Sequence, residues 1–215
     1  MAQAALRALL AGPTASELAA APGLSSGVPG DTLLFGVSIA DGVARVDLSE
    51  EFGSGGGEAS LFGRIAQVVY TVTQFSTVRA VELRLDGRPA PLFTGDGAPL
   101  DRPAVRDDYL RFLPPVFVDR PWSGQSVDSP LRLTGRANVF EARFFAEVSD
   151  AGGRSLGRTA VMATCGSGCW GDFDVRLPFN EPGTRRGWLS VWTASPRDGS
   201  VQDLRRYPIV FGSGG

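Results

Sequence analysis

The spacing of apolar residues over positions 1–93 switches between helical and alternating periods, which is typical of a mixed α and β domain. Helical spacing occurs over 4–11 and 58–75, and alternation occurs over 33–39, 43–48 and 78–85. Asp41-Gly42 separates the first two strands and is a hairpin signal. These elements predict the order α-β-β-α-β, an α+β sandwich in which helices cover one face of a small sheet.

Two local features of this part give specific expectations. Thr14 and Glu17 have the spacing of a capping box, which predicts a further helical turn over 15–20. In the hairpin, alternation predicts one buried face. The side chains expected on it are Leu33, Phe35, Val37, Ile39, Ala44, Val46 and Leu48.

Beyond Pro115 only alternation remains, which predicts an all-β domain. The expected strands are 116–119, 130–137, 139–149, 155–163, 172–178, 187–194 and 203–211. Seven short strands in this length of chain are typical of an immunoglobulin-like β-sandwich. In the third strand, the residues expected to face inward are Phe140, Ala142, Phe144, Ala146 and Val148.

The domain boundary is expected where Pro, Asp and Gly accumulate between these two patterns. We predict an α/β domain over residues 1–113, of which 94–113 form a linker region, and a β-sandwich over residues 114–215. Asp107-Asp108 lies in this region and is interpreted as solvated charge.

Composition excludes several functional classes. The formal net charge is −2, so nothing indicates a nucleic-acid partner. His is absent, which excludes Ser-His-Asp and Cys-His nucleophiles, HExxH metalloproteases and His-ligated zinc. No apolar run reaches the roughly 18 residues of a membrane span, and the first residues lack the pattern of a signal peptide. We expect no metal, no cofactor and no catalytic residues.

Cys165 and Cys169 enclose Gly166-Ser167-Gly168. This spacing differs from the CxxC redox motif, and two thiolates alone do not complete a zinc site. The glycines allow a tight curl, so a structural disulfide is favoured, with two free thiols as the alternative. A disulfide favours a location outside the cytoplasm.

Aromatic and polar side chains supply the candidate binding residues. Trp122 and Trp170 lie near predicted loops, where an aromatic ring can stack on a sugar or anchor an interface. Trp188 and Trp192 share one face of a strand and are interpreted as core. Thr71 and Gln74 lie on the polar side of the long helix, where they either contact a partner or bond locally.

The first part resembles the GerMN domain of bacterial sporulation and spore germination proteins. The matching stretches are ALLAGPT at 8–14, DGVARVDLS at 41–49, QVVYTVTQF at 67–75 and VELRLDG at 81–87. The second part resembles the immunoglobulin-like domain of bacterial spore germination. It matches through SP at 129–130, GRA at 135–137, VFEA at 139–142, GDF at 171–173, and Asp150 with Gly153.

The resemblance implies an exported bacterial envelope protein, often a lipoprotein, whose first domain is similar in fold to the ring-building motif of secretion and sporulation channels. It implies no catalytic residues. We therefore expect a non-enzymatic structural or assembly protein that self-associates or docks on envelope partners, held at the membrane only through an inferred lipid anchor. The alternative is a module that binds peptidoglycan, another envelope glycan or a peptide through exposed aromatic residues. An enzyme would need paired carboxylates such as Glu50-Glu51 or Asp107-Asp108.

Overall fold

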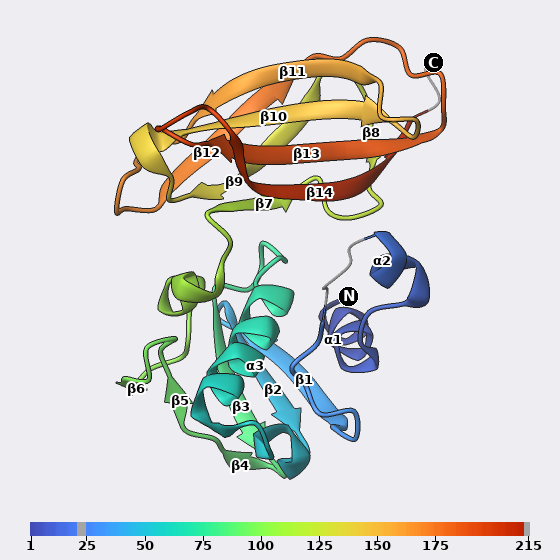
Figure 1. Cartoon of the computed structure of the whole chain (residues 1–215). Coiled ribbons are helices and arrows are strands. Elements are labelled where there is room, and N and C mark those ends of the chain that lie inside the picture. The colour runs from blue at the N-terminus through green and yellow to red at the C-terminus, as the bar shows by residue number, and fades with distance from the viewer. Residues whose placement is uncertain (21–24, 213–215) are drawn as a thin grey trace. The chain divides into compact units, whose positions relative to one another are not determined.

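The computed structural model describes residues 1–20 and 25–212, and the chain divides into two compact units, Met1–Phe112 and Leu113–Gly215 (Figure 1). The first unit is α+β and the second is all-β, as the sequence predicts. None of the helices in the described part of the chain is long and apolar enough to cross a membrane.

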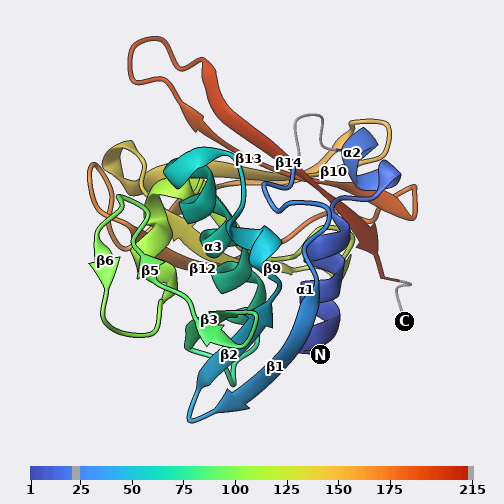
Figure 2. The ribbon, with the colours of Figure 1, turned by 90° about the horizontal axis from the view of Figure 1, so that it is seen from below.

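The first unit places helices on one face of a four-stranded sheet of order β1-β2-β3-β4 (Figure 2). Its elements are α1 (Ala2–Ala11), α2 (Ala15–Ala20), β1 (Leu34–Ala40), β2 (Val43–Leu48), η1 (Glu50–Gly53), α3 (Gly57–Val72), β3 (Ala80–Leu85), β4 (Arg88–Pro89), β5 (Leu92–Phe93), β6 (Pro99–Leu100) and η2 (Arg106–Phe112). β1 and β2 form the predicted antiparallel hairpin. α3 joins β2 to β3, which are parallel and therefore need such a crossover.

The core of this unit lies between α3 and the sheet. Ile65, Val68 and Val72 on α3 are fully buried with Val46 and Val81 from the strands. The predicted capping box at α2 is confirmed. The Thr14 N–H donates to Glu17 Oε2 at 2.7 Å, and the Glu17 N–H donates back to Thr14 Oγ1 at 3.3 Å.

The predicted buried face of the hairpin is wrong at Leu33, Phe35 and Ile39, and Ile39 is 43% exposed because β1 is an edge strand. Val37 and Ile39 lie opposite the buried Val46 and Ala44, but the register shifts between Leu34 and Gly36. A bulge of this kind reverses the side on which neighbouring side chains lie. Leu33 and Phe35 are consequently 59% and 54% exposed.

The segment expected to be a linker, 94–113, instead packs as part of the first unit up to Phe112. Ala104 and Val81 exchange two backbone hydrogen bonds of 2.8 and 2.9 Å. Tyr109 is fully buried in the core of the unit. The interpretation of Asp107-Asp108 as solvated charge is wrong at Asp108, whose side chain is 8% exposed and pairs with Arg102 at 2.7 Å.

The second unit is a sandwich of two sheets of order β11-β10-β13-β14-β8 and β12-β9-β7 (Figure 1). Its elements are β7 (Val116–Arg120), β8 (Ser126–Val127), β9 (Leu131–Ala137), the turn η3 (Phe140–Ala142), β10 (Arg143–Asp150), β11 (Ser155–Met162), β12 (Gly171–Leu177), β13 (Arg186–Ala194) and β14 (Val201–Phe211). All seven predicted strands are present, and only the short β8 was not predicted. The immunoglobulin-like sandwich is confirmed.

The interpretation of Trp188 and Trp192 as core is wrong about the face on which they lie, although Trp192 is buried at 7% exposure and Trp188 is half-buried. Leu189 and Val191 on the same strand are fully buried between the sheets. Because successive side chains of a strand point to opposite faces, the two Trp side chains lie on the outer face of the five-stranded sheet. There they pack against Phe145 and arginine side chains rather than in the core.

Candidate interaction surfaces

The structure does not bring together the binding residues predicted from sequence. Trp122 follows β7, is 53% exposed and has the Arg120 guanidinium 4.8 Å from its ring centroid. Trp170 is half-buried directly after Cys169. In the first unit, Thr71 and Gln74 lie at the end of α3, and Gln74 Nε2 donates to the Thr71 carbonyl at 2.6 Å. These residues form no common site.

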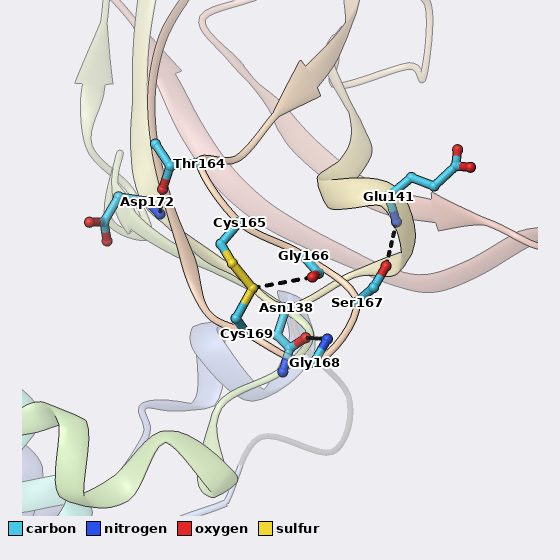
Figure 3. The surroundings of a disulfide bond; sticks show 9 residues. All are labelled: Asn138, Glu141, Thr164, Cys165, Gly166, Ser167, Gly168, Cys169 and Asp172. Atoms are coloured by element: carbon cyan, nitrogen blue, oxygen red, sulfur yellow. Dashed lines mark hydrogen bonds between the residues drawn. A yellow bond between two sulfur atoms is a disulfide. The ribbon is translucent and has the colours of Figure 1, made fainter.

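Cys165 and Cys169 form a disulfide in the loop between β11 and β12, with a Cα–Cα distance of 5.8 Å (Figure 3). The loop between them packs on the turn that precedes β10. The Glu141 N–H donates to Ser167 Oγ at 2.9 Å, and the Ser167 N–H donates to the Val139 carbonyl at 2.8 Å. The disulfide loop and the turn therefore hold each other in place.

That turn has an unusual backbone. Glu141 and Ala142 have φ of 52° and 56°, in the left-handed region that L-residues rarely adopt. Glycine at position 166 permits this close approach, because a Cβ there would lie only 2.3 Å from the Ala142 backbone nitrogen. The turn interrupts the alternation of β10, so Phe140 is 59% exposed and not inward as predicted.

In each of the two carboxylate pairs considered for catalysis, one carboxylate accepts hydrogen bonds from neighbouring residues of its own segment. Glu50 and Glu51 lie in η1, where hydrogen bonds from the Ser49 side chain and the backbone lower the pKa of Glu51. Burial works to raise the pKa of Asp108, but hydrogen bonds from Arg102 and the Val105 N–H outweigh it and lower the pKa. Over residues 1–20 and 25–212, no group of three or more His, Cys, Asp or Glu could hold a metal ion.

The surface that stands out in the first unit is the edge strand β1. Among the described strands it pairs with β2 alone, so its other side presents free backbone groups. Residues 33–40 contain no charged residue and no Pro. Phe35 is 54% and Ile39 43% exposed, and Ser38 and Ala40 are also exposed. The helix α1 contacts β1 but leaves these residues uncovered.

Edge strands of natural proteins usually carry charges or Pro that prevent pairing with another chain. β1 has only the bulge before Gly36. Sequence reasoning missed this surface because strict alternation assigned Phe35 to the core. The available signal was Gly36 in the middle of a strand, which often marks a bulge.

Comparison with protein families gives two matches. Residues 1–91 match the family described as sporulation and spore germination, and residues 115–200 match the immunoglobulin-like domain of bacterial spore germination. A comparison with curated protein sequences finds no match.

Solved structures give further similarities. A candidate lipoprotein from Clostridium perfringens is 21% identical with a TM-score of 0.40, over 50% of this chain and 68% of that one. The first GerMN domain of GerM from Bacillus subtilis is 29% identical with a TM-score of 0.40, over 49% and 78%. The tandem GerMN domains of the same protein are 19% identical with a TM-score of 0.41, over 82% and 52%.

Proposed function

We propose that this protein is a non-enzymatic structural component of the bacterial cell envelope and that it self-associates through the edge strand β1. Its chain joins a GerMN domain of the sporulation and spore germination family to the immunoglobulin-like domain of bacterial spore germination. The uncharged, exposed β1 is the observation that carries this proposal.

The edge of β1 offers a second strand both backbone hydrogen bonds and an apolar contact. Pairing would satisfy the free backbone groups of β1 and cover the exposed ring of Phe35. Antiparallel pairing of two such strands would also avoid like charges, because β1 carries none. We expect weak association that rises with concentration, since a single strand edge buries a small area.

Two observations support a location outside the cytoplasm. The disulfide between Cys165 and Cys169 is a bond that persists in oxidising compartments. One similar structure is a candidate lipoprotein, and we propose a lipid anchor for this protein as well. Mass spectrometry of the protein from bacterial membranes tests the anchor, because an acylated N-terminal peptide is expected.

Sedimentation velocity over a wide range of concentration tests the assembly. We expect the wild-type protein to shift toward larger species as concentration rises. The variant Phe35→Lys/Ile39→Lys should remain monomeric, because like charges at an edge oppose pairing. Far-UV circular dichroism establishes that this variant is folded.

A matched control separates strand pairing from a general effect of added charge. Val201→Lys/Leu204→Lys introduces the same charges at β14 residues that are 58% and 53% exposed. This control should associate like the wild type. A wild-type protein that stays monomeric at every concentration, or a control that loses association as fully as the β1 variant, would overturn the proposal.

A further inference from the structure

The outer face of the five-stranded sheet carries a layer of arginine side chains on aromatic rings. Phe145 and Trp192 lie opposite each other on β10 and β13, and their rings stack at 5.7 Å with an angle of 22°. The Arg158 guanidinium lies 5.1 Å from the Phe145 centroid and 4.7 Å from the Trp192 centroid. We call this surface the arginine face, and its residues are Arg143, Phe145, Arg158, Trp188, Trp192 and Arg206.

Two further arginines lie on rings of the same face. The Arg143 guanidinium is 5.3 Å from the Phe145 centroid, and that of Arg206 is 4.8 Å from the Trp188 centroid. Stacking fixes each guanidinium plane, so less freedom is lost when its N–H groups bind a ligand.

These guanidinium groups lack the carboxylate partners that other arginines of the chain have. Salt bridges to Asp or Glu side chains are formed by Arg45, Arg102, Arg111, Arg132, Arg136 and Arg154. Within the part of the chain that the structure describes, Arg143, Arg158 and Arg206 form no salt bridge. This holds although Glu147 lies directly opposite Arg158 in the register of β10 and β11.

We propose that the arginine face binds an acidic, extended polypeptide segment of a partner protein. A planar guanidinium matches a carboxylate through two parallel hydrogen bonds, which favours carboxylate side chains as the ligand groups. This surface is separate from β1 and does not depend on self-association.

Guanidinium groups cover the aromatic rings of the arginine face, which favours a polypeptide over a glycan as its ligand. Aromatic side chains bind sugars through their ring faces, and here guanidinium groups lie over rings of Phe145, Trp188 and Trp192. At one end of the face, Phe140 and Met162 are 59% and 60% exposed. Apolar side chains of a polypeptide would cover these two residues, whereas a charged glycan offers none.

The strained turn places Phe140 beside the arginine face. A groove of about 330 Å³ is lined by Phe140, Glu141, Arg143, Phe145, Ala194, Ser195 and Pro196. Residues in the left-handed region persist where surrounding contacts impose them, often at functional sites. Here the disulfide loop imposes the conformation, and the result is an exposed ring next to Arg143.

The register of the strands sets the spacing of the ligand carboxylates. Arg158, Glu147, Ser190 and Arg206 follow one another across β11, β10, β13 and β14. Three strand spacings of about 4.8 Å separate the two arginines by about 14 Å. Carboxylates four residues apart on an extended chain are about 13 Å apart. Glu147 between the arginines disfavours a carboxylate in the middle.

Fluorescence anisotropy with two labelled peptides of equal composition tests this spacing. The first repeats Glu-Val-Ser-Thr and so places a carboxylate at every fourth residue, and the second groups its glutamates in one block. We expect the full chain to bind the spaced peptide about tenfold more tightly than the block peptide, because a block that reaches both arginines also places a carboxylate opposite Glu147. Equal binding of the two peptides, or no binding of either, would overturn the proposal.

Variants locate the binding on this face. Arg158→Lys/Arg206→Lys keeps both charges but loses the planar fork, and Kd for the spaced peptide should rise about tenfold or more. Arg176→Gln/Arg185→Gln removes two exposed arginines elsewhere on the same unit and should leave Kd nearly unchanged. A control that weakens binding as much as the first variant would show general charge attraction and refute the assignment.

Competition with polygalacturonate, an acidic polysaccharide, tests whether the ligand is instead a glycan. We expect it to displace the spaced peptide poorly. Tighter binding of this polymer than of the peptide, lost in Arg158→Lys/Arg206→Lys, would reject a polypeptide ligand in favour of a glycan. All measurements are repeated in the Phe35→Lys/Ile39→Lys background, where self-association is expected to be absent.

Discussion

The two units of this protein bury polar groups in different ways. Among the described residues, four buried side-chain polar atoms lack a hydrogen-bond partner, and all four belong to the first unit: Thr32 Oγ1, Arg64 Nε, Gln67 Oε1 and the Tyr109 hydroxyl. The second unit places most of its charged side chains on the outer faces of its sheets, as in the exposed pair of Arg132 with Asp174. The first unit therefore buries polar atoms that its own hydrogen bonds do not fully satisfy, and among the described residues the second unit does not.

Arg64 shows how a buried polar side chain acts as an anchor. It is only 2% exposed, and its guanidinium donates to the carbonyls of Phe52 at 2.6 Å and Ser54 at 2.7 Å. It also donates to the Gly55 carbonyl and to Ser60 Oγ at 3.2 Å. One cation on α3 thus holds the loop that precedes the helix. The sandwich has a smaller counterpart in Asp150, which is 8% exposed and accepts hydrogen bonds of 3.0 Å from the N–H groups of Gly152 and Arg154 in the turn after β10.

The largest difference in stability between the two units is expected when Tyr109 is replaced. Tyr109→Ala removes a fully buried ring from the first unit and should destabilise that unit by about 3–5 kcal/mol. Urea unfolding followed by far-UV circular dichroism measures this, because the α-helices described all lie in the first unit. Tyr109→Phe is the control and should be neutral or stabilising, since it removes a hydroxyl without a partner. A large loss of stability in Tyr109→Phe would contradict this account.

A smaller loss is expected at Arg64. Arg64→Met keeps much of the side-chain volume but removes the donors to the loop carbonyls, and should destabilise the first unit by about 2–3 kcal/mol. Arg45→Met is the matched control, because Arg45 is 49% exposed and its pair with Glu82 is on the surface. That control should change stability by less than about 1 kcal/mol. Equal effects of the two substitutions would show that the buried cation is not an anchor.

The disulfide provides the corresponding test for the second unit. Cys165→Ser/Cys169→Ser should lower the stability of this unit by about 2 kcal/mol, as expected for so short a closed loop. All four Trp residues lie beyond residue 113, so Trp fluorescence follows the unfolding of the second unit. The far-UV signal of the first unit should not shift. A shift in both signals would show that the two units do not unfold separately.

The smallest effect is a dependence on pH. The pKa of Asp108 is lowered in the folded state, with its carboxylate 2.7 Å from Arg102. Such a group contributes stability above its unfolded pKa, near 4, and that contribution is lost as pH falls through the folded pKa. Urea midpoints should therefore drop below about pH 4 in the wild type. Asp108→Asn should show a weaker drop, and an identical acid dependence would exclude this role.

The sequence predicted the second unit well for a physical reason. Alternation of apolar and polar residues is a direct consequence of strand geometry, so Phe144, Ala146 and Val148 were correctly placed inward. It failed at Phe140, because two left-handed residues break the alternation there. It also placed Trp188 and Trp192 on the inner face of the sheet instead of the outer one, since large side chains on one face of a strand are compatible with either side.

Prediction of the first unit failed where tertiary contacts override composition. Pro and Asp around Tyr109 resembled a linker, although the ring is buried and Ala104 pairs with Val81. The bulge before Gly36 reversed the assignment of Phe35. Of the candidate site residues, Trp122, Trp170, Thr71 and Gln74 remain scattered. The arginine face depends on the register of four strands, which no local pattern specifies.

Amide hydrogen exchange of β1 at low and high protein concentration reports directly on whether the protein assembles through this strand. If the protein assembles by strand pairing at this edge, amides within Leu34–Ala40 should become more protected as concentration rises. The same amides in Phe35→Lys/Ile39→Lys should exchange equally at both concentrations. Oligomers in which the β1 amides gain no protection would contradict assembly through this strand.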